Sequence, residues 1–117
     1  MAVDDTHPEH GDIWMADLRP ARGHEQDGIR PVLVVSLDHL NILRRGLVVT
    51  VPLTTTAIPL PGHVRIAPPE GGVTRVSYAL CEHVRSISHV RLRRRMGKVS
   101  PGTISSLHRP LRRILGV

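Results

Sequence analysis

Two short and almost continuously apolar runs constrain the fold of this 117-residue chain most strongly. The first is residues 32–35, which contain three valines, and the second is residues 47–53. Runs of this length and composition predict strands that are buried on both faces, because a strand with one wet face would alternate apolar and polar residues. Pro52 lies within the second run, so we expect the end of that strand to lie at a sheet edge or a bulge.

Shorter segments with alternating polarity predict the remaining strands. They lie at residues 11–18, 63–67 and 76–80, with residues 82–87 continuing or following the last of these after a bend, and with a final short strand at 97–99. In the first segment, Ile13 and Met15 should share one face, and Trp14 and Ala16 the other. Residues 38–45 are expected to form a polar connection, and residues 91–95 a short helical turn.

The clearest predicted helix is at the C-terminal end of the sequence. Ser100 can cap it, Pro101 suits its first turn and Gly116 suits its end. Five apolar residues recur at helical spacing on one face: Ile104, Leu107, Leu111, Ile114 and Leu115. Pro110 cannot donate to the carbonyl of Ser106, which predicts a kink or break near Arg109.

Short, closely spaced strands followed by one helix predict an α+β, mostly β fold. We expect a small, strongly bent antiparallel sheet or barrel with the C-terminal helix packed on it. Residues 11–117 should form a single domain, preceded by a loose polar tail at residues 1–10.

Composition excludes several classes of protein. No apolar run reaches the roughly 20 residues that a membrane helix needs. The one cysteine, Cys81, cannot form an internal disulfide; it suits a reducing cytoplasm and a place in the core rather than nucleophilic chemistry. Only Trp14 and Tyr78 are aromatic, which disfavours a platform for sequence-independent base stacking.

The net charge of +6 is unevenly distributed. Residues 1–82 hold seven arginines against ten carboxylates, whereas residues 83–117 hold eight arginines and Lys98 with no acid. The basic C-terminal third predicts a polyanionic partner, either nucleic acid or an acidic protein segment. The eight histidines lack metal-ligand spacing, and Walker, GxGxxG and GxSxG motifs are absent from the sequence. We therefore expect neither a metal nor a cofactor.

Arg30 and Thr54 each stand where a predicted buried strand meets a polar loop. Consecutive strands usually pair, so both side chains could face one cleft. A guanidinium can stabilise the charge on a five-coordinate phosphorus, and a hydroxyl can bind a phosphate oxygen. Glu25, in the loop before Arg30, could accept a proton from a ribose 2′-hydroxyl or position the arginine. The alternatives left open are a solvated arginine, a turn-capping threonine and a solvated loop acid.

Four segments resemble the motifs of MazF/PemK toxins. Residues 11–14 (GDIW) and 17–36 (DLRPARGHEQDGIRPVLVVS) resemble the N-terminal signature of that family. Residues 51–54 (VPLT) resemble its second motif, residues 80–87 (LCEHVRSI) its E-Q-[IV]-[RK]-[ST]-I motif, and Gly97–Ser100 before a helix its usual end. The resemblance covers residues 11–116 in the family's order.

The resemblance implies an SH3-like, PemK/CcdB-like barrel and a homodimeric, metal-independent endoribonuclease. Such toxins are neutralised by a cognate antitoxin with an acidic C-terminal segment, and cleave single-stranded RNA by attack of the 2′-hydroxyl. The products are a 2′,3′-cyclic phosphate and a 5′-hydroxyl. By position in the motifs, Arg30 would be the chief catalytic group, assisted by Thr54 and Glu25.

By the same resemblance, we expect five residues to bind the substrate: His24, Gln26, Thr55, His83 and Arg85. His24 and His83 replace the serine and glutamine usual in the family, which should alter base preference rather than abolish cleavage. Two alternatives stay open: a non-enzymatic toxin of the same barrel type, like the gyrase-poisoning CcdB family, and a nucleic-acid-binding barrel without catalysis. The target sequence, the class of RNA and the antitoxin cannot be read from the sequence.

Overall fold

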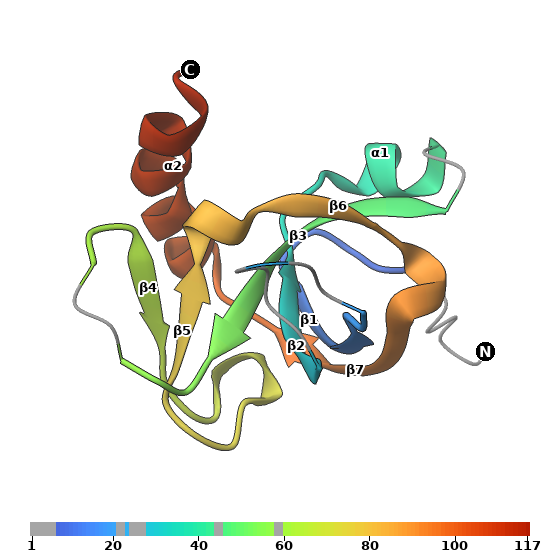
Figure 1. Ribbon diagram of the computed structural model, residues 1–117, viewed down its shortest axis with the longest axis horizontal. Helices are drawn as coiled ribbons and strands as arrows, with labels where there is room; N and C mark the ends of the chain where they lie inside the picture. Colours follow the sequence, from blue (N-terminus) through green and yellow to red (C-terminus); the bar gives the residue numbers. More distant parts are fainter. Residues whose placement is uncertain (1–6, 21–22, 24–27, 44–45, 58–59) are drawn as a thin grey trace.

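The computed structural model describes residues 7–20, 23, 28–43, 46–57 and 60–117. Within them the chain forms a bent antiparallel sheet and a long C-terminal helix (Figure 1). The strands are β1 (Asp12–Asp17), β2 (Ile29–Val34), β3 (Leu47–Thr54), β4 (His63–Ile66), β5 (Ser77–Leu80), β6 (Arg85–Ser88) and β7 (Leu92–Lys98). The helices are α1 (Asp38–Leu43) and α2 (Pro101–Leu115), and three short 3₁₀ turns are η1 (Glu70–Gly72), η2 (Cys81–His83) and η3 (His89–Arg91).

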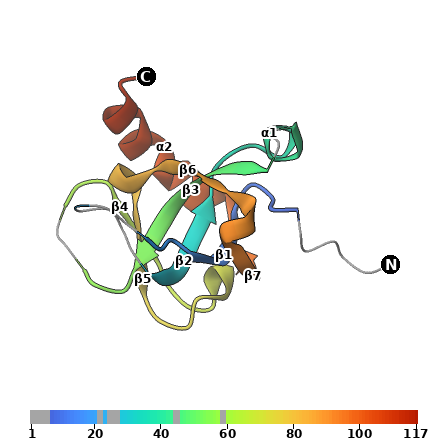
Figure 2. The same cartoon turned by 45° about the vertical axis from the view of Figure 1, so that its right-hand side comes forward.

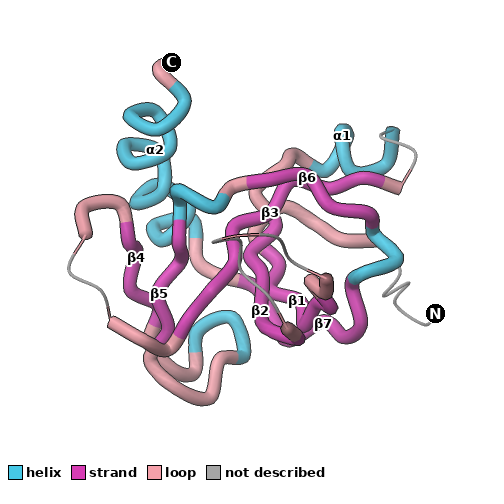
Figure 3. The backbone as a smooth tube through the Cα atoms, viewed as in Figure 1, coloured by secondary structure: helices cyan, strands magenta, loops and turns pink. Residues whose placement is uncertain are grey.

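The sheet follows the order β4-β5-β3-β2-β1-β7, and β6 pairs with β3 beside β5. Every described pairing is antiparallel, and the two ends of this order, β4 and β7, are not paired with each other among the described residues. The sheet is thus strongly bent, as expected, but does not close into a ring. From β5 the chain turns through η2 into β6, then through η3 into β7, which returns beneath β1 (Figure 3).

Two apolar clusters lie on opposite faces of the central strands. On β1, Ile13 belongs to the first cluster, and Trp14 and Ala16 belong to the second; on β2, Leu33 and Val32 divide in the same way. Alternation puts successive side chains on opposite faces, so a strand whose two faces are both covered reads as a continuous apolar run. The prediction of doubly buried strands is confirmed, since residues 32–34 are completely buried.

Helix α2 covers the first cluster. Ser100 caps it by accepting from the backbone N–H of Thr103, Pro101 opens its first turn, and Gly116 ends it in the left-handed conformation, all as predicted. Leu107 is buried in the cluster, and Ile104 and Leu111 pack against it. The last turns, by contrast, carry Ile114, 42% exposed, and Leu115, 57% exposed. α2 stands at the opposite end of the molecule from α1 (Figures 1 and 2), and it is not long and apolar enough to span a membrane, nor is any other helix in the described ranges.

Three local predictions are wrong. Residues 38–43 form helix α1 rather than a plain connection, since the backbone N–H groups of Leu40 and Asn41 bond the carbonyl of Leu37. Residues 92–95 lie in strand β7 because they pair with β1, which overrides their helical preference. The predicted break in the C-terminal helix is absent, because α2 continues through Pro110. Two other expectations agree with the structure: strand β3 is central, and Pro52, near its end, lies at the interruption where the partner of β3 changes from β6 to β5.

Candidate active site

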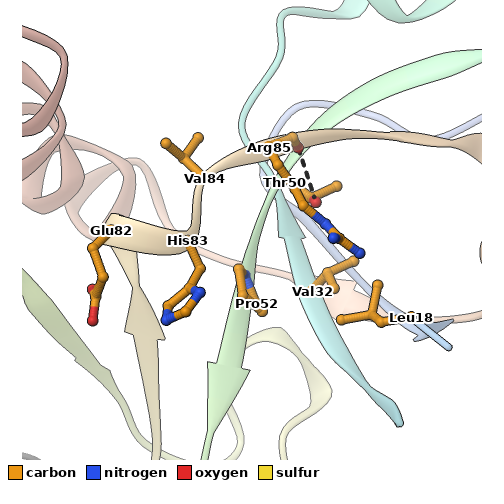
Figure 4. A pocket seen from close by; sticks show the side chains of 8 residues that line it. All are labelled: Leu18, Val32, Thr50, Pro52, Glu82, His83, Val84 and Arg85. Atoms are coloured by element: carbon orange, nitrogen blue, oxygen red, sulfur yellow. Dashed lines mark hydrogen bonds between the residues drawn. The ribbon is translucent and has the colours of Figure 1, made fainter. Parts of the chain in front are cut away.

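A cavity of about 300 Å³ opens where the partner of β3 changes. β6 pairs with residues 47–50 of β3 and β5 pairs with residues 53–54, so residues 51 and 52 face no strand on that side. Pro52 suits this gap because it has no backbone N–H to leave unpaired. The chain passes around the gap as η2, and the cavity is lined by Leu18, Val32, Thr50, Pro52, Glu82, His83, Val84 and Arg85 (Figure 4).

Strand register places Arg30 and Thr54 on the face that opens into this cavity. Val32 lies opposite Pro52, and Val34 lies opposite Thr50, so these four side chains share one face of the sheet. Arg30 is two residues before Val32 on β2, and Thr54 is two residues after Pro52 on β3, which keeps both on that face. The paired section ends at Val32 and Pro52, so Arg30 and Thr54 stand level with each other just beyond it.

Both side chains are half-buried at the ends of rigid strands. Arg30 lies opposite Ala16 of β1, whose small side chain is fully buried. The Thr54 hydroxyl oxygen accepts from the backbone N–H of Thr56 at 3.2 Å, which is the turn-capping contact considered from the sequence. That bond uses the oxygen as an acceptor, so the hydroxyl hydrogen can still donate to a bound anion.

Arg85 and His83 reach the cavity from the segment that crosses the gap in the sheet. Arg85 lies opposite Thr50, whose hydroxyl donates to the Arg85 carbonyl at 3.3 Å. Its guanidinium extends along the cavity toward Val32 and Leu18, and the His83 ring lies between Glu82 and Pro52 (Figure 4). Sequence comparison with the family motif predicted both positions, and the structure places both in the lining.

Glu82 brings a carboxylate to the same cavity. His63 of β4 contacts it, with 2.7 Å between Nε2 and Oε2, and the His63 side chain is only 3% exposed. Burial raises the pKa of Glu82, but the hydrogen bonds from His63 and from the backbone outweigh burial and leave this pKa below its usual value. The carboxylate is therefore ionised at neutral pH. His63 could not be predicted as part of the site, because nothing in its local sequence indicates a partner 19 residues away.

The loop between β1 and β2 is held at both ends. The Leu18 N–H donates to the Gly28 carbonyl at 2.9 Å, and Nη1 of Arg91 donates to the carbonyls of Asp17 and Arg19 at 3.0 and 2.9 Å. The three predicted residues of this loop, His24, Glu25 and Gln26, lie outside the described residues. Thr55 is exposed directly after β3. No group of three or more His, Cys, Asp or Glu side chains in the described ranges could hold a metal ion.

The fold and cavity define a recognisable class of small β protein. A MazF crystal structure from Deinococcus radiodurans superposes with a TM-score of 0.81 at 30% identity, covering 94% of this chain and 97% of that one. An endoribonuclease from a Mycobacterial species, solved in complex with its cognate antitoxin, gives a TM-score of 0.78 at 26% identity, covering 94% and 96% of the two chains.

The chain belongs to the PemK-like, MazF-like toxins of type II toxin–antitoxin systems, whose family model matches residues 9–115. It is 36% identical over 107 residues to the endoribonuclease MazF9 of Mycobacterium tuberculosis, covering 87% of this chain and 91% of that protein. It is 38% identical over 85 residues to the endoribonuclease EndoA of Bacillus subtilis, covering 72% and 73%. The family resemblance read from the motifs is thus confirmed, and a CcdB-like gyrase poison is not favoured.

Proposed function

We propose that this chain is the toxin of a toxin–antitoxin pair and cleaves single-stranded RNA without a metal. The observation that carries the proposal is the register that puts Arg30 and Thr54 level on one face, beside the cavity lined by His83 and Arg85. Two cationic side chains and a hydroxyl beside an open cavity suit a phosphodiester better than a neutral substrate. Similarity to two proteins named as endoribonucleases, over 87% and 72% of this chain, supports the same reaction.

In the proposed reaction the ribose 2′-oxygen attacks the adjacent phosphorus, and the bond from phosphorus to the 5′-oxygen breaks. Glu25 accepts the 2′-hydroxyl proton or, if it positions Arg30 instead, a water molecule accepts that proton; the departing 5′-oxygen takes up a proton from water. The Arg30 guanidinium stabilises the additional negative charge on the five-coordinate phosphorus, and Thr54 donates to a non-bridging oxygen. The products are a 2′,3′-cyclic phosphate and a 5′-hydroxyl.

The nucleotides that flank the scissile bond would be bound by His24, Gln26, Thr55, His83 and Arg85. In the cell, a homodimer in the cytoplasm would be neutralised by an antitoxin whose acidic C-terminal segment competes with RNA for the cationic side chains. Charge complementarity supports this mode of inhibition, because residues 83–117 carry nine cationic side chains and no carboxylate side chain.

The test compares four proteins on one RNA substrate in excess EDTA: wild type, Arg30→Ala, Thr54→Ala and Arg112→Ala. Arg112 lies exposed on α2, so its variant controls for the loss of one positive charge. We expect the Arg30 change to reduce the cleavage rate by a factor of at least about 100, the Thr54 change to reduce it by about 10 to 100, and the control to cleave normally. New 5′ ends should be hydroxyls.

Two results would contradict the proposal. Equal binding of RNA by all four proteins with no cleavage by wild type would identify a binding module. Cleavage by wild type that EDTA abolishes would show that the reaction needs a metal.

A further inference from the structure

A second and larger cavity, of about 470 Å³, lies on β7 and η3. Its described lining is Trp14, His89, Val90, Leu92, Arg93, Arg94 and Arg95, none of which lines the candidate active site. We call it the β7 arginine cavity. His89, Arg93 and Arg94 are exposed to solvent, and none of the described lining residues is acidic. The cavity is therefore open, cationic and separate from the catalytic groups proposed above.

Two irregularities in the pairing of β7 gather these arginines. Met15 and Ala16 are adjacent on β1 but lie opposite Arg94 and Leu92, so Arg93 is an extra residue on β7; a second shift follows between Ile13 and Trp14. In a regular strand, successive side chains point to opposite faces, and three consecutive arginines could not all line one cavity. An extra residue bends the strand and redirects the side chains beside it. The irregular backbone of β7 thus brings the three arginine side chains to the same cavity.

The neighbouring carboxylates neutralise only part of this charge. Asp17 is bound by Arg19 at 2.9 Å and more weakly by Arg93 at 3.4 Å. Its pKa is held below the usual range, first by the hydrogen bonds from Arg19 and then by Arg93. The Arg91 guanidinium donates to carbonyls, which leaves its charge unbalanced.

Asp12 and Glu9 lie at the other end of β7, where they pair with Arg95 and Lys98. Across this surface three carboxylates, Glu9, Asp12 and Asp17, face six cationic side chains: Arg19, Arg91, Arg93, Arg94, Arg95 and Lys98. Counted over the described residues alone, these side chains carry a net charge of +3.

The cavity is close to the proposed catalytic arginine. Ala16 of β1 lies opposite Arg30 on one side and opposite Leu92, which lines the cavity, on the other. Two strand spacings separate the Cα atoms of Arg30 and Leu92, which is roughly 10 Å. A short single-stranded RNA that reaches Arg30 can therefore extend across β1 to the arginines of β7.

We propose that the β7 arginine cavity is an exosite that binds backbone phosphates of the RNA outside the scissile dinucleotide. This inference rests on the proposed function and extends it to a second contact with the same strand. Arginine favours phosphate because its planar group can donate two parallel hydrogen bonds. Trp14 is only 4% exposed and its indole N–H is bonded to Asp12, so the indole ring offers bases no surface on which to stack. The exosite therefore contributes affinity that depends on length rather than on sequence.

The test uses 2′-O-methyl RNA oligomers of random sequence, 6 and 18 nucleotides long, which no 2′-hydroxyl mechanism can cleave. The double variant Arg93→Ala/Arg94→Ala is compared with wild type and with the control Arg112→Ala/Arg113→Ala, which removes two exposed arginines from α2. Arg95 is left in place because it pairs with the fully buried Asp12. Thermal unfolding of all three proteins checks that each is folded.

We expect wild type and the control to bind the 18-mer at least about tenfold more tightly than the 6-mer, and the Arg93/Arg94 variant to lose most of that gain. For the Arg93/Arg94 variant, the slope of log Kd against log[salt] measured with the 18-mer should be smaller by about 1.4. That is the value expected for the loss of two phosphate contacts on a single strand. Cleavage of a short RNA should be unchanged.

Three results would overturn the exosite. The first is that wild type binds the 18-mer no more tightly than the 6-mer. The second is that the Arg112/Arg113 control loses as much affinity for the 18-mer as the Arg93/Arg94 variant. The third is that the cavity binds poly-glutamate but not the 18-mer, which would indicate an acidic protein segment as the partner. Failure of wild type to cleave any RNA would remove the proposed function, while the binding of the uncleavable oligomers would still report on the exosite.

Discussion

His63 and Glu82 join two segments of the candidate active site that are 19 residues apart in sequence. Their side chains meet at 2.7 Å between Nε2 and Oε2. His63 begins the strand that follows the loop after Thr54, and Glu82 lies in η2 beside His83. The pair thus connects the start of β4, which follows the loop after the proposed catalytic hydroxyl, to the turn that forms one wall of the cavity.

We expect His63→Ala to loosen η2 and to weaken RNA binding more than it slows bond cleavage. KM should rise by about three- to tenfold, with kcat within about a factor of two, since His63 positions the cavity wall without touching the phosphate. Steady-state cleavage of one RNA, with His108→Ala on the exposed face of α2 as the matched control, measures both constants. A kcat loss of a hundredfold with KM unchanged would instead give His63 a direct part in the chemistry.

A second prediction concerns the dependence of stability on pH. Both Glu70 and Glu82 have a pKa below the usual value. For Glu70 the causes are the Thr103 hydroxyl and then the Ser100 backbone; for Glu82 burial raises the pKa, but the hydrogen bonds from His63 and from the backbone together lower it by more. A depressed folded pKa stabilises the protein above the unfolded pKa of about 4.3, and this contribution is lost as the pH falls through the folded value.

The free energy of unfolding should therefore decrease below about pH 4.5, and the decrease should be shallower in Glu70→Gln than in wild type. Urea titrations at pH 3.5, 4.5 and 7 measure it. At pH 7, Glu70→Gln should cost about 1 kcal/mol, because the acceptor of the Ser100 N–H and the Thr103 hydroxyl loses its charge. Parallel pH profiles for the two proteins would rule out Glu70 as a source of the acid sensitivity.

The sequence predicted the central strands, the helix and its caps because each depends on short-range rules. The continuous apolar composition of residues 32–35 is enough to predict a strand that is buried on both faces. Ser100, Pro101 and Gly116 are residue types that prefer the start or the end of a helix in most folds. Arg30 and Thr54 could be placed near each other because consecutive strands usually pair.

What could not be predicted depends on contacts between distant segments. Residues 92–95 favour a helix by local preference, and only pairing with β1 makes them a strand. The His63–Glu82 contact and the β7 arginine cavity depend on register and on bulges, neither of which leaves a local signal. His83 and Arg85 were found through the family motif, because their chemistry alone does not distinguish them from the other histidines and arginines.

A third prediction tests a close approach of two backbone segments. An added Cβ at Gly97 would lie 2.7 Å from the carbonyl carbon of Gly71 and 2.9 Å from the nitrogen of Gly72, and backbone atoms cannot move aside as a flexible side chain can. We expect Gly97→Ala to destabilise the fold by about 2–4 kcal/mol.

Gly102→Ala is the matched control for this substitution. At Gly102, in the first turn of α2, the nearest atom to an added Cβ is the Ser100 hydroxyl oxygen at 3.7 Å. Alanine should be neutral there or stabilise by up to about 1 kcal/mol, because it favours the helix. Urea unfolding monitored by circular dichroism measures both changes; equal effects in the two variants would show that β7 and η1 can separate without cost.

A fourth prediction concerns Cys81, which is fully buried in the first apolar cluster. Burial, together with the neighbouring Glu82 charge, raises the pKa of the thiol to about 11. At pH 8 the thiolate is therefore a small minority, and it is also shielded from solvent. A thiol-reactive disulfide reagent should label the native protein at least about 100-fold more slowly than the protein in urea. Rapid stoichiometric labelling of the native state would show that the cluster opens easily.

A fifth prediction distinguishes base preference from catalysis at His83. The ring points into the cavity beside Pro52, two residues along β3 from Thr54, so it can contact a base next to the scissile phosphate without reaching the phosphorus (Figure 4). Glutamine, usual at this position in the family, presents a carbonyl oxygen and an amide donor in place of one ring donor and one ring acceptor.

We expect His83→Gln to change which RNA sites are cut while total cleavage stays within about threefold of wild type. Mapping the 5′ ends of a transcript pool cleaved by each protein measures the change, with His108→Gln as the control. An unchanged set of sites, or loss of cleavage at every site, would show that His83 does not select bases.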